Sequence, residues 1–189
     1  SDTQEKIGSR SAFDGGKDDY WISSNLVDLY ENQDGSKFNW DDIIPGYNNM
    51  QPSQREVFFF RNNLTDKEIK AAQNRGLDMS LYLPDGNEER IKKAYENRDP
   101  RLALNAITPY STYLGSTNGE DHLVTSRWPF RNEQPPVNDL RTNFQTYFFY
   151  LYRKFVYEGT SETLDRDYGP IDFPLIRYVG VLLMWAEAI

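Results

Sequence analysis

Three groups of aromatic residues in polar stretches are the side chains whose types and spacing point to chemistry. They are Tyr20 with Trp21, Trp40 with Tyr47, and Arg127 with Trp128. Sugar rings expose apolar C–H faces and outward hydroxyls, so exposed Trp or Tyr rings flanked by amide, carboxylate or guanidinium groups suit a neutral glycan. The sequence therefore predicts ligand contact at one or more of these groups. The competing interpretation is that the rings form small cores that pin long loops, and both interpretations are open at this point.

Carboxylates and the single histidine suggest weaker alternatives. The pairs Asp41–Asp42 and Glu120–Asp121 would suit a glycoside hydrolase if two carboxylates faced one bond, but among 29 acidic residues adjacent pairs arise by chance. His122 is of a type that binds metal or acts as a base, yet one histidine in a polar loop is more typical of solvated surface. We therefore expect no catalytic residue, no metal site and no cofactor, with a hydrolase as the less favoured alternative.

The elements that must position these side chains are short. Helices are predicted over 24–31, over 65–76 after the capping box of Thr65 and Glu68, and after Asn87 as a cap. Strands are predicted over 57–60, 102–107 and 144–157, and residues 36–50 and 108–142 are expected to be mainly loop. The fold class that follows is mixed, mainly helical, with long loops and a small β element.

Bulk composition excludes several kinds of partner and site. The chain has 189 residues, a formal net charge of -8, 38% hydrophobic residues and 15% aromatic residues. An acidic surface disfavours nucleic-acid phosphates and anionic membranes as partners. The absence of cysteine excludes disulfides, thiolate metal sites and a cysteine nucleophile in these residues.

Residues 173–189 are predicted to form a helix that begins near Pro174 and is apolar around most of its circumference. It is too short for a bilayer, and Arg177 and Glu187 fit lipid poorly. No capping residue follows Ile189, so we expect a fragment whose partner helices are missing. The face bearing Leu182, Met184 and Trp185 should then be bare or covered by another molecule.

Four stretches together resemble the SusD/RagB family of Bacteroidetes outer-membrane lipoproteins. They cover residues 25–35, 95–102, 152–155 and 172–188, and the last is similar to the family's signature helix. Val179-Gly180 departs from the family, which more often has a small residue followed by an acidic one. Gly180 costs about 1 kcal/mol relative to Ala inside a helix, although it also permits close approach of a neighbouring helix.

The resemblance implies a surface-exposed protein of the outer membrane that captures a glycan and passes it to a SusC-like TonB-dependent transporter. It implies a lipid anchor and amino-terminal tetratricopeptide-like helical repeats, both outside this stretch. Residues 1–172 would form a loop-rich ligand-binding region, and residues 173–189 would start the carboxyl-terminal helical part. Family members are not usually enzymes, and the alternative role is that of a scaffold or lid subunit of such a transporter, handling peptides.

Overall fold

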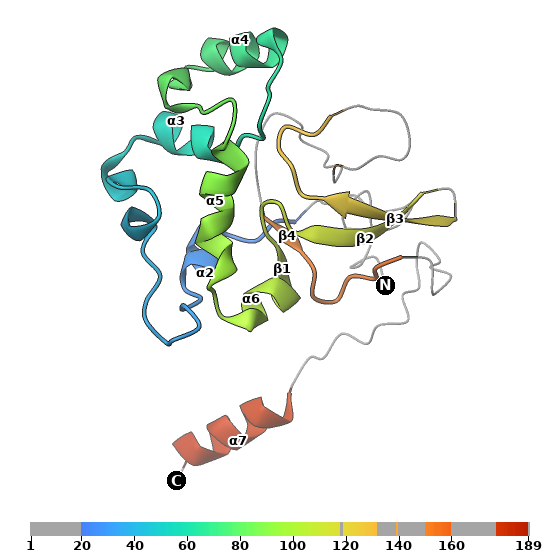
Figure 1. Ribbon diagram of the computed structural model, residues 1–189. Coiled ribbons are helices and arrows are strands. Elements are labelled where there is room, and N and C mark those ends of the chain that lie inside the picture. Colours follow the sequence, from blue (N-terminus) through green and yellow to red (C-terminus); the bar gives the residue numbers. More distant parts are fainter. Residues whose placement is uncertain (1–19, 118, 132–138, 140–149, 160–176, 189) are drawn as a thin grey trace.

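The computed structural model describes residues 20–117, 119–131, 139, 150–159 and 177–188 (Figure 1).

Side-chain caps define where several helices begin. Helix α4 (Asp66–Asn74) opens with a reciprocal capping box, in which the Thr65 hydroxyl accepts from Glu68 N at 3.3 Å and Glu68 Oε2 accepts from Thr65 N at 2.8 Å. Asp99 caps α6 (Pro100–Asn105) by accepting from Arg101 N at 2.8 Å. The predicted capping box is confirmed.

The other described helical elements are mostly short. They are α2 (Ser24–Asp28), α3 (Pro52–Arg55), α5 (Asn87–Glu96) and α7 (Tyr178–Glu187), with single 3-10 turns over Trp40–Asp42, Tyr47–Asn49, Glu56–Phe59 and Met79–Leu81. Strands β1 (Ala106–Ile107) and β4 (Leu151–Tyr152) pair antiparallel, with Ala106 opposite Tyr152. Strands β2 (Thr112–Thr117) and β3 (Glu120–Thr125) form an antiparallel hairpin. The predicted mixed fold class is confirmed.

Several predicted elements were wrong. Residues 57–60 form a 3-10 turn and its cap instead of a strand, and residues 102–105 belong to α6, so only the last two positions of the predicted strand at 102–107 are extended. The stretch 108–142, expected to be mainly loop, contains the β2–β3 hairpin. Gly86 and not Asn87 precedes α5 as its cap. Most of the predicted strand at 144–157 and the predicted helix start at Pro174 lie outside the described residues.

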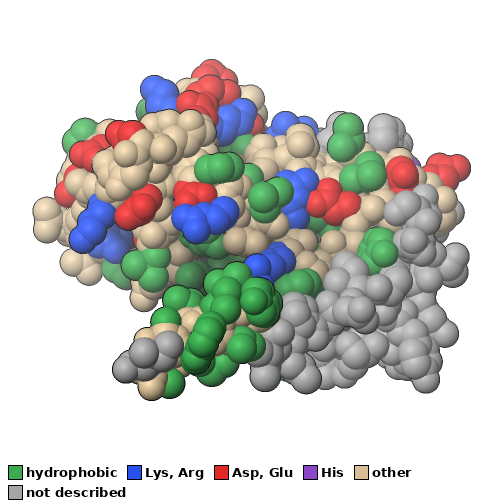
Figure 2. Space-filling view, turned by 90° about the horizontal axis from the view of Figure 1, so that it is seen from below, with side chains coloured by type: hydrophobic (Ala, Val, Ile, Leu, Met, Phe, Trp, Pro, Cys, Tyr) green, Lys and Arg blue, Asp and Glu red, His purple; other side chains and the backbone are tan. Residues whose placement is uncertain are grey.

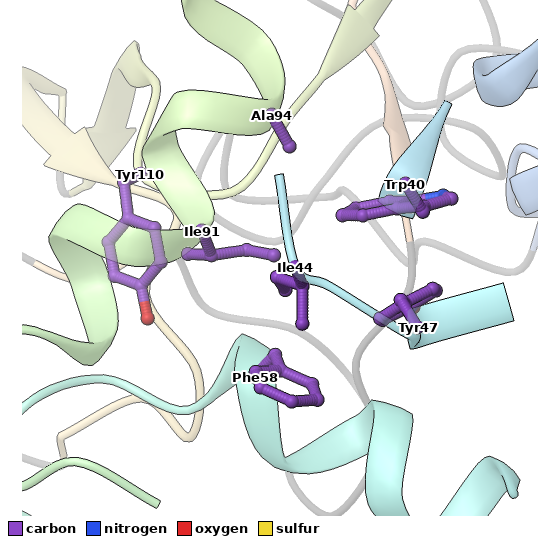
Figure 3. Packing of buried hydrophobic residues seen from close by; sticks show 7 residues of the cluster. All are labelled: Trp40, Ile44, Tyr47, Phe58, Ile91, Ala94 and Tyr110. Carbon is purple, nitrogen blue, oxygen red and sulfur yellow. The ribbon is translucent and has the colours of Figure 1, made fainter. Parts of the chain in front are cut away.

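The side chain of the buried Asn87 donates to backbone carbonyls of the run 57–60. Its Nδ2 lies 3.1 Å from the carbonyl oxygen of Val57, 3.3 Å from that of Phe58 and 2.7 Å from that of Phe60. These carbonyls would pair with a neighbouring strand if 57–60 were itself a strand. The asparagine therefore ties the aromatic run to α5, and Phe58 and Ile91 belong to one buried cluster (Figure 3).

The core is divided among small clusters along the chain. One contains Trp40, Tyr47, Phe58 and Ile91, and a second contains Val57, Phe60, Tyr82 and Trp128. In Figure 1, α3, α4 and α5 lie on one side of the body and the β2–β3 hairpin on the other. The 3-10 turn Glu56–Phe59 supplies residues to both clusters, so it connects the two aromatic groups predicted at Trp40 and Trp128.

Helix α7 lies apart from the body in Figure 1, and all of its apolar side chains are substantially exposed. Leu182 is 39% exposed, Met184 56% and Trp185 65%. Figure 2 shows hydrophobic side chains gathered over this helix. The expectation that this face is bare is confirmed. None of the described helices is both long and apolar enough to span a bilayer.

Candidate ligand-binding site

Two hollows in the described surface contain most of the predicted site residues or lie next to them. The first, called here the aromatic hollow, has a volume of about 520 Å³. Its rings come from four separate parts of the chain, namely Trp40, Tyr47, Phe59 and Tyr150. Its polar side chains are those of Ser24, Asn25, Asp28, Asn48, Arg55 and Glu56. A half-open cavity with aromatic walls and a few convergent polar groups is the usual form of a small-molecule site.

Trp40 and Tyr47 form the stacked wall of the aromatic hollow. Their ring centroids lie 4.6 Å apart with the planes 22° from parallel, and two successive 3-10 turns hold them in that position (Figure 3). The prediction that these rings are exposed was wrong, because Trp40 is 7% and Tyr47 6% exposed. Burial raises the pKa of Tyr47 to about 12, so its hydroxyl stays protonated at neutral pH.

Asp28 supplies one of the two carboxylates of the aromatic hollow, the other being that of Glu56. Its Oδ1 accepts a hydrogen bond from Trp40 Nε1 at 3.1 Å, which ties the end of α2 to the stacked wall. Burial raises the pKa of Asp28, and the Trp40 hydrogen bond and the charge of Arg98 partly oppose that rise. A half-buried carboxylate that keeps acceptor capacity is suited to receiving hydrogen bonds from sugar hydroxyls.

Arg55 also lines the aromatic hollow and bonds the backbone of the 3-10 turn Tyr47–Asn49. Its Nε donates to the Tyr47 carbonyl at 3.0 Å and its Nη2 to the Asn48 carbonyl at 2.6 Å, while the guanidinium carbon lies 5.2 Å from the Tyr47 ring centroid. These contacts make the 3-10 turn Tyr47–Asn49 rigid relative to α3. No local sequence pattern points to this arginine beyond its charge.

Tyr20 and Trp21 immediately precede Ile22, which lines the aromatic hollow and pairs with Tyr150 through an Ile22 N to Tyr150 O hydrogen bond of 3.0 Å. Tyr20 is 56% and Trp21 44% exposed, so the predicted exposure of this pair is confirmed. The structure thus brings two of the three predicted groups, Tyr20 with Trp21 and Trp40 with Tyr47, to one region of the surface.

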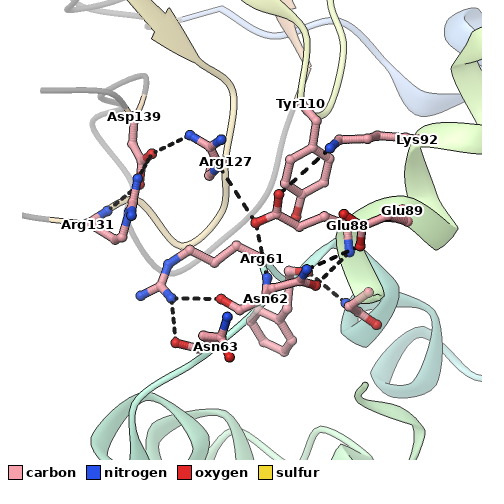
Figure 4. A network of polar contacts seen from close by, with 12 residues as sticks. Arg61, Asn62, Asn63, Glu88, Glu89, Lys92, Tyr110, Arg127, Arg131 and Asp139 are labelled. Atoms are coloured by element: carbon pink, nitrogen blue, oxygen red, sulfur yellow. Dashed lines mark hydrogen bonds and ion pairs between the residues drawn. The ribbon is translucent and has the colours of Figure 1, made fainter. Parts of the chain in front are cut away.

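The two residues of the third predicted group, Arg127 and Trp128, lie in different environments. Trp128 is 5% exposed and stacks on Phe60 with ring centroids 4.5 Å apart, so its predicted exposure was wrong. Arg127 lines a second hollow of about 910 Å³, called here the arginine hollow. Its lining includes Arg61, from the segment after the 3-10 turn Glu56–Phe59, and Arg127 and Arg131, from the segment after β3; Figure 4 shows these three side chains. Sequence reasoning missed Arg61, whose burial depends on contacts far along the chain.

The carboxylates considered for hydrolysis have structural partners. Asp41 Oδ1 accepts from Asn48 N at 2.9 Å, and Asp42 lies within 3.5 Å of Asn39 Nδ2, so both stabilise the 3-10 turns. Neither is among the described residues that line the two hollows. His122, Glu120 and Asp121 lie on β3, and among the described residues no cluster of His, Cys, Asp and Glu could hold a metal ion.

The stretches that resemble the SusD/RagB family also meet in space. Residue 32, in the first stretch, pairs with residue 98 in the second, and Asp99 N donates to the Glu31 carbonyl at 2.8 Å. In the third stretch, Tyr152 pairs with Ala106 just beyond α6, and Arg153 N donates to the Asn105 carbonyl at 3.0 Å. These stretches therefore act together in forming the fold, and only the first supplies side chains to the aromatic hollow.

Fold and site together define a mixed, loop-rich protein whose described surface contains the aromatic hollow and the arginine hollow. Comparison with protein families gives a match to the SusD family over residues 2–189, and the chain belongs to that family. Membership places it among nutrient-binding proteins of the outer membrane, which are generally non-catalytic. No curated protein and no solved structure matches the chain.

Proposed function

We propose that this protein captures a glycan at the aromatic hollow without modifying it and delivers it to a SusC-like TonB-dependent transporter at the cell surface. The observation that carries the glycan assignment is the stacked pair Trp40–Tyr47 in a hollow whose rim bears hydroxyl, amide and carboxylate groups. The transporter, the lipid anchor and the surface location rest on family membership.

Each chemical requirement of a sugar has a matching group in or beside the hollow. Trp40 and Tyr47 line the hollow with apolar ring atoms, and Trp21 provides an exposed ring next to the lining residue Ile22. Asp28 accepts hydrogen bonds from hydroxyls, while Ser24 and Asn25 at the start of α2 are exposed and can donate as well as accept.

The test is affinity electrophoresis in native gels that contain neutral plant, host or microbial polysaccharides. Trp21→Ala removes the exposed ring, and Asp28→Asn removes the carboxylate while leaving a carbonyl to accept from Trp40. For a glycan that retards the wild type, each variant should weaken binding by about 1–2 kcal/mol, or roughly tenfold.

Trp185→Ala is the matched control, because Trp185 is also an exposed tryptophan but lies on α7, outside the hollow. It should leave the retardation unchanged. Unchanged retardation of both Trp21→Ala and Asp28→Asn would overturn the assignment of the site, and absence of binding to every glycan would overturn the proposed function.

A further inference from the structure

The arginine hollow has a charge opposite to that of the whole protein. Four basic side chains line it, Arg61, Lys67, Arg127 and Arg131, against two acidic ones, Glu68 and Glu88. The complete chain carries a formal net charge of -8. A local excess of positive charge on an acidic molecule favours anionic groups within reach of the hollow.

Arg61 forms the floor of this hollow and is 5% exposed. Its Nε donates to the Pro129 carbonyl at 2.9 Å, its Nη1 lies 3.0 Å from the Asn63 carbonyl, and its Nη2 bonds Glu68 Oε1 at 2.6 Å. It therefore neutralises Glu68 and joins the loop after residue 60 to the loop after residue 128. Its hydrogen-bonding capacity is mostly used within the protein.

One buried carboxylate, that of Asp139, accepts hydrogen bonds from both Arg127 and Arg131. Asp139 is 1% exposed and accepts from Arg127 Nη1 at 3.1 Å and from Arg131 Nε and Nη2, each at 2.9 Å (Figure 4). Burial acts to raise the pKa of Asp139, but the hydrogen bonds from Arg131 and Arg127 outweigh it, so the pKa lies below its ordinary value. The carboxylate thus stays charged and fixes both arginines.

Donors remain available for a ligand. Arg127 makes its contacts through Nη1 with Asp139 and through Nε, 3.7 Å from Glu88, which leaves Nη2 without a hydrogen bond to a described residue. Lys67 is exposed on the first turn of α4 and makes no ion pair with a described residue. One fixed guanidinium edge and one mobile ammonium are suited to a carboxylate, whose two oxygens can each accept.

The other lining groups suit a sugar ring. Phe130 is half-buried in the lining and offers an apolar surface to the C–H face of a sugar, and the Asn63 side chain is exposed and can bond hydroxyls. We propose that the arginine hollow binds the carboxylate of a uronic acid residue, so that the protein prefers an acidic glycan. This inference rests on the proposed function, since it takes the ligand to be a glycan.

The test compares polygalacturonate, its methyl ester and dextran sulfate in affinity electrophoresis of the complete protein. The acid and the ester share a backbone and differ in the charge of the carboxyl group, while dextran sulfate offers charge without carboxylate. We expect binding to polygalacturonate, with little binding to the ester or to dextran sulfate. Lys67→Gln and Arg127→Gln should each weaken it about tenfold, the loss typical of one charge-assisted hydrogen bond.

Lys70→Gln is the matched control, because Lys70 is an exposed lysine on the same helix but is not in the lining. It changes the net charge by the same amount and should leave binding unchanged. Lys67→Gln removes no ion pair with a described residue, so the loss of a structural ion pair does not account for its effect. Arg127→Lys keeps the charge but loses the planar guanidinium edge, and it should restore binding only in part.

Equal effects of Lys67→Gln and Lys70→Gln would overturn the proposal, as would equal binding of dextran sulfate or of the methyl ester. Binding of poly-glutamate in place of polygalacturonate would also overturn it, since the ligand would then be an acidic peptide. Binding of a neutral glycan that depends on Trp21 and Asp28, without binding of polygalacturonate, would overturn this inference and leave the proposed function standing. Absence of binding to any glycan would overturn both.

Discussion

Arg98 is a buried cation that holds together two segments far apart in the sequence. It is 4% exposed, and its Nη2 donates to the carbonyl of Val27 at 2.6 Å and to that of Tyr30 at 2.8 Å. Its guanidinium carbon lies 3.7 Å from the centroid of the Phe38 ring. The carbonyls at the end of α2 are thereby satisfied by a side chain from the end of α5. Because Asp28 lies in this segment, Arg98 also supports one wall of the aromatic hollow.

Replacing Arg98 should therefore be costly. We expect Arg98→Ala to lower the free energy of unfolding by about 3–4 kcal/mol, because buried carbonyls lose their donors and a cavity forms beneath Phe38. Arg101→Ala is the control, since that side chain is 73% exposed in its ion pair with Asp99 and should change the free energy of unfolding little. Urea unfolding followed by tryptophan fluorescence measures both, and equal losses would contradict the structural role assigned to Arg98.

Single tryptophans show what the sequence alone could not predict about the site. Trp40 and Trp128 both lie in polar loops, and the flanking residues of each suggested exposure, but Trp40 stacks on Tyr47 and Trp128 on Phe60. Stacking partners 7 and 68 positions away decide burial, and neither spacing is a local pattern. Trp21 has the same kind of polar neighbours and is exposed. Polar neighbours in the sequence therefore do not predict which of these aromatic rings solvent reaches.

Among the elements, those defined by local chemistry were predictable from the sequence. The box of Thr65 and Glu68 depends on residues three positions apart and formed as expected, whereas the cap of Asp99 on α6 was not predicted. The run over 57–60 has strand composition, yet Asn87 Nδ2 meets its carbonyls in place of a strand ladder. A side chain from 27 to 30 positions away thus overrides the β propensity of the run.

The capping box of α4 offers a quantitative test at this scale. Thr65→Ala removes the acceptor for Glu68 N and the hydroxyl that donates to Glu68 Oε2 at 2.9 Å, and should lower the free energy of unfolding by about 1 kcal/mol. Thr65→Ser keeps the hydroxyl and should retain most of the stability. Urea midpoints measure the difference, and a loss in Thr65→Ser as large as in Thr65→Ala would mean that the methyl group and not the cap is responsible.

At the scale of the whole molecule, the body and α7 differ in how far their apolar side chains are buried. The body buries its apolar residues in small clusters, while α7 presents Leu182, Leu183, Met184 and Trp185 to solvent. Contiguous apolar patches of this kind on soluble proteins mark sites of association. A Cβ added at Gly180 would meet nothing within 4 Å, so the glycine that departs from the family pattern has no packing role among the described contacts.

The exposed face of α7 should make the 189-residue chain self-associate as its concentration rises. Leu183→Glu combined with Met184→Glu places two charges on side chains that are 66% and 56% exposed, and should abolish the association. The free energy of unfolding should change by less than about 0.5 kcal/mol, because neither side chain is buried. Sedimentation velocity across a concentration series measures the first quantity, and urea unfolding the second.

The matched control is Leu104→Glu combined with Leu123→Glu, which adds the same charge at leucines that are 70% and 69% exposed on α6 and β3. If net charge alone kept the chain apart, the control would reduce association as much as the α7 variant does. If the patch on α7 is responsible, only the α7 variant becomes monomeric. A fall in stability of the α7 variant, with the control unchanged, would instead show that the helix packs on the body in solution and that its exposed face is covered from within the same chain.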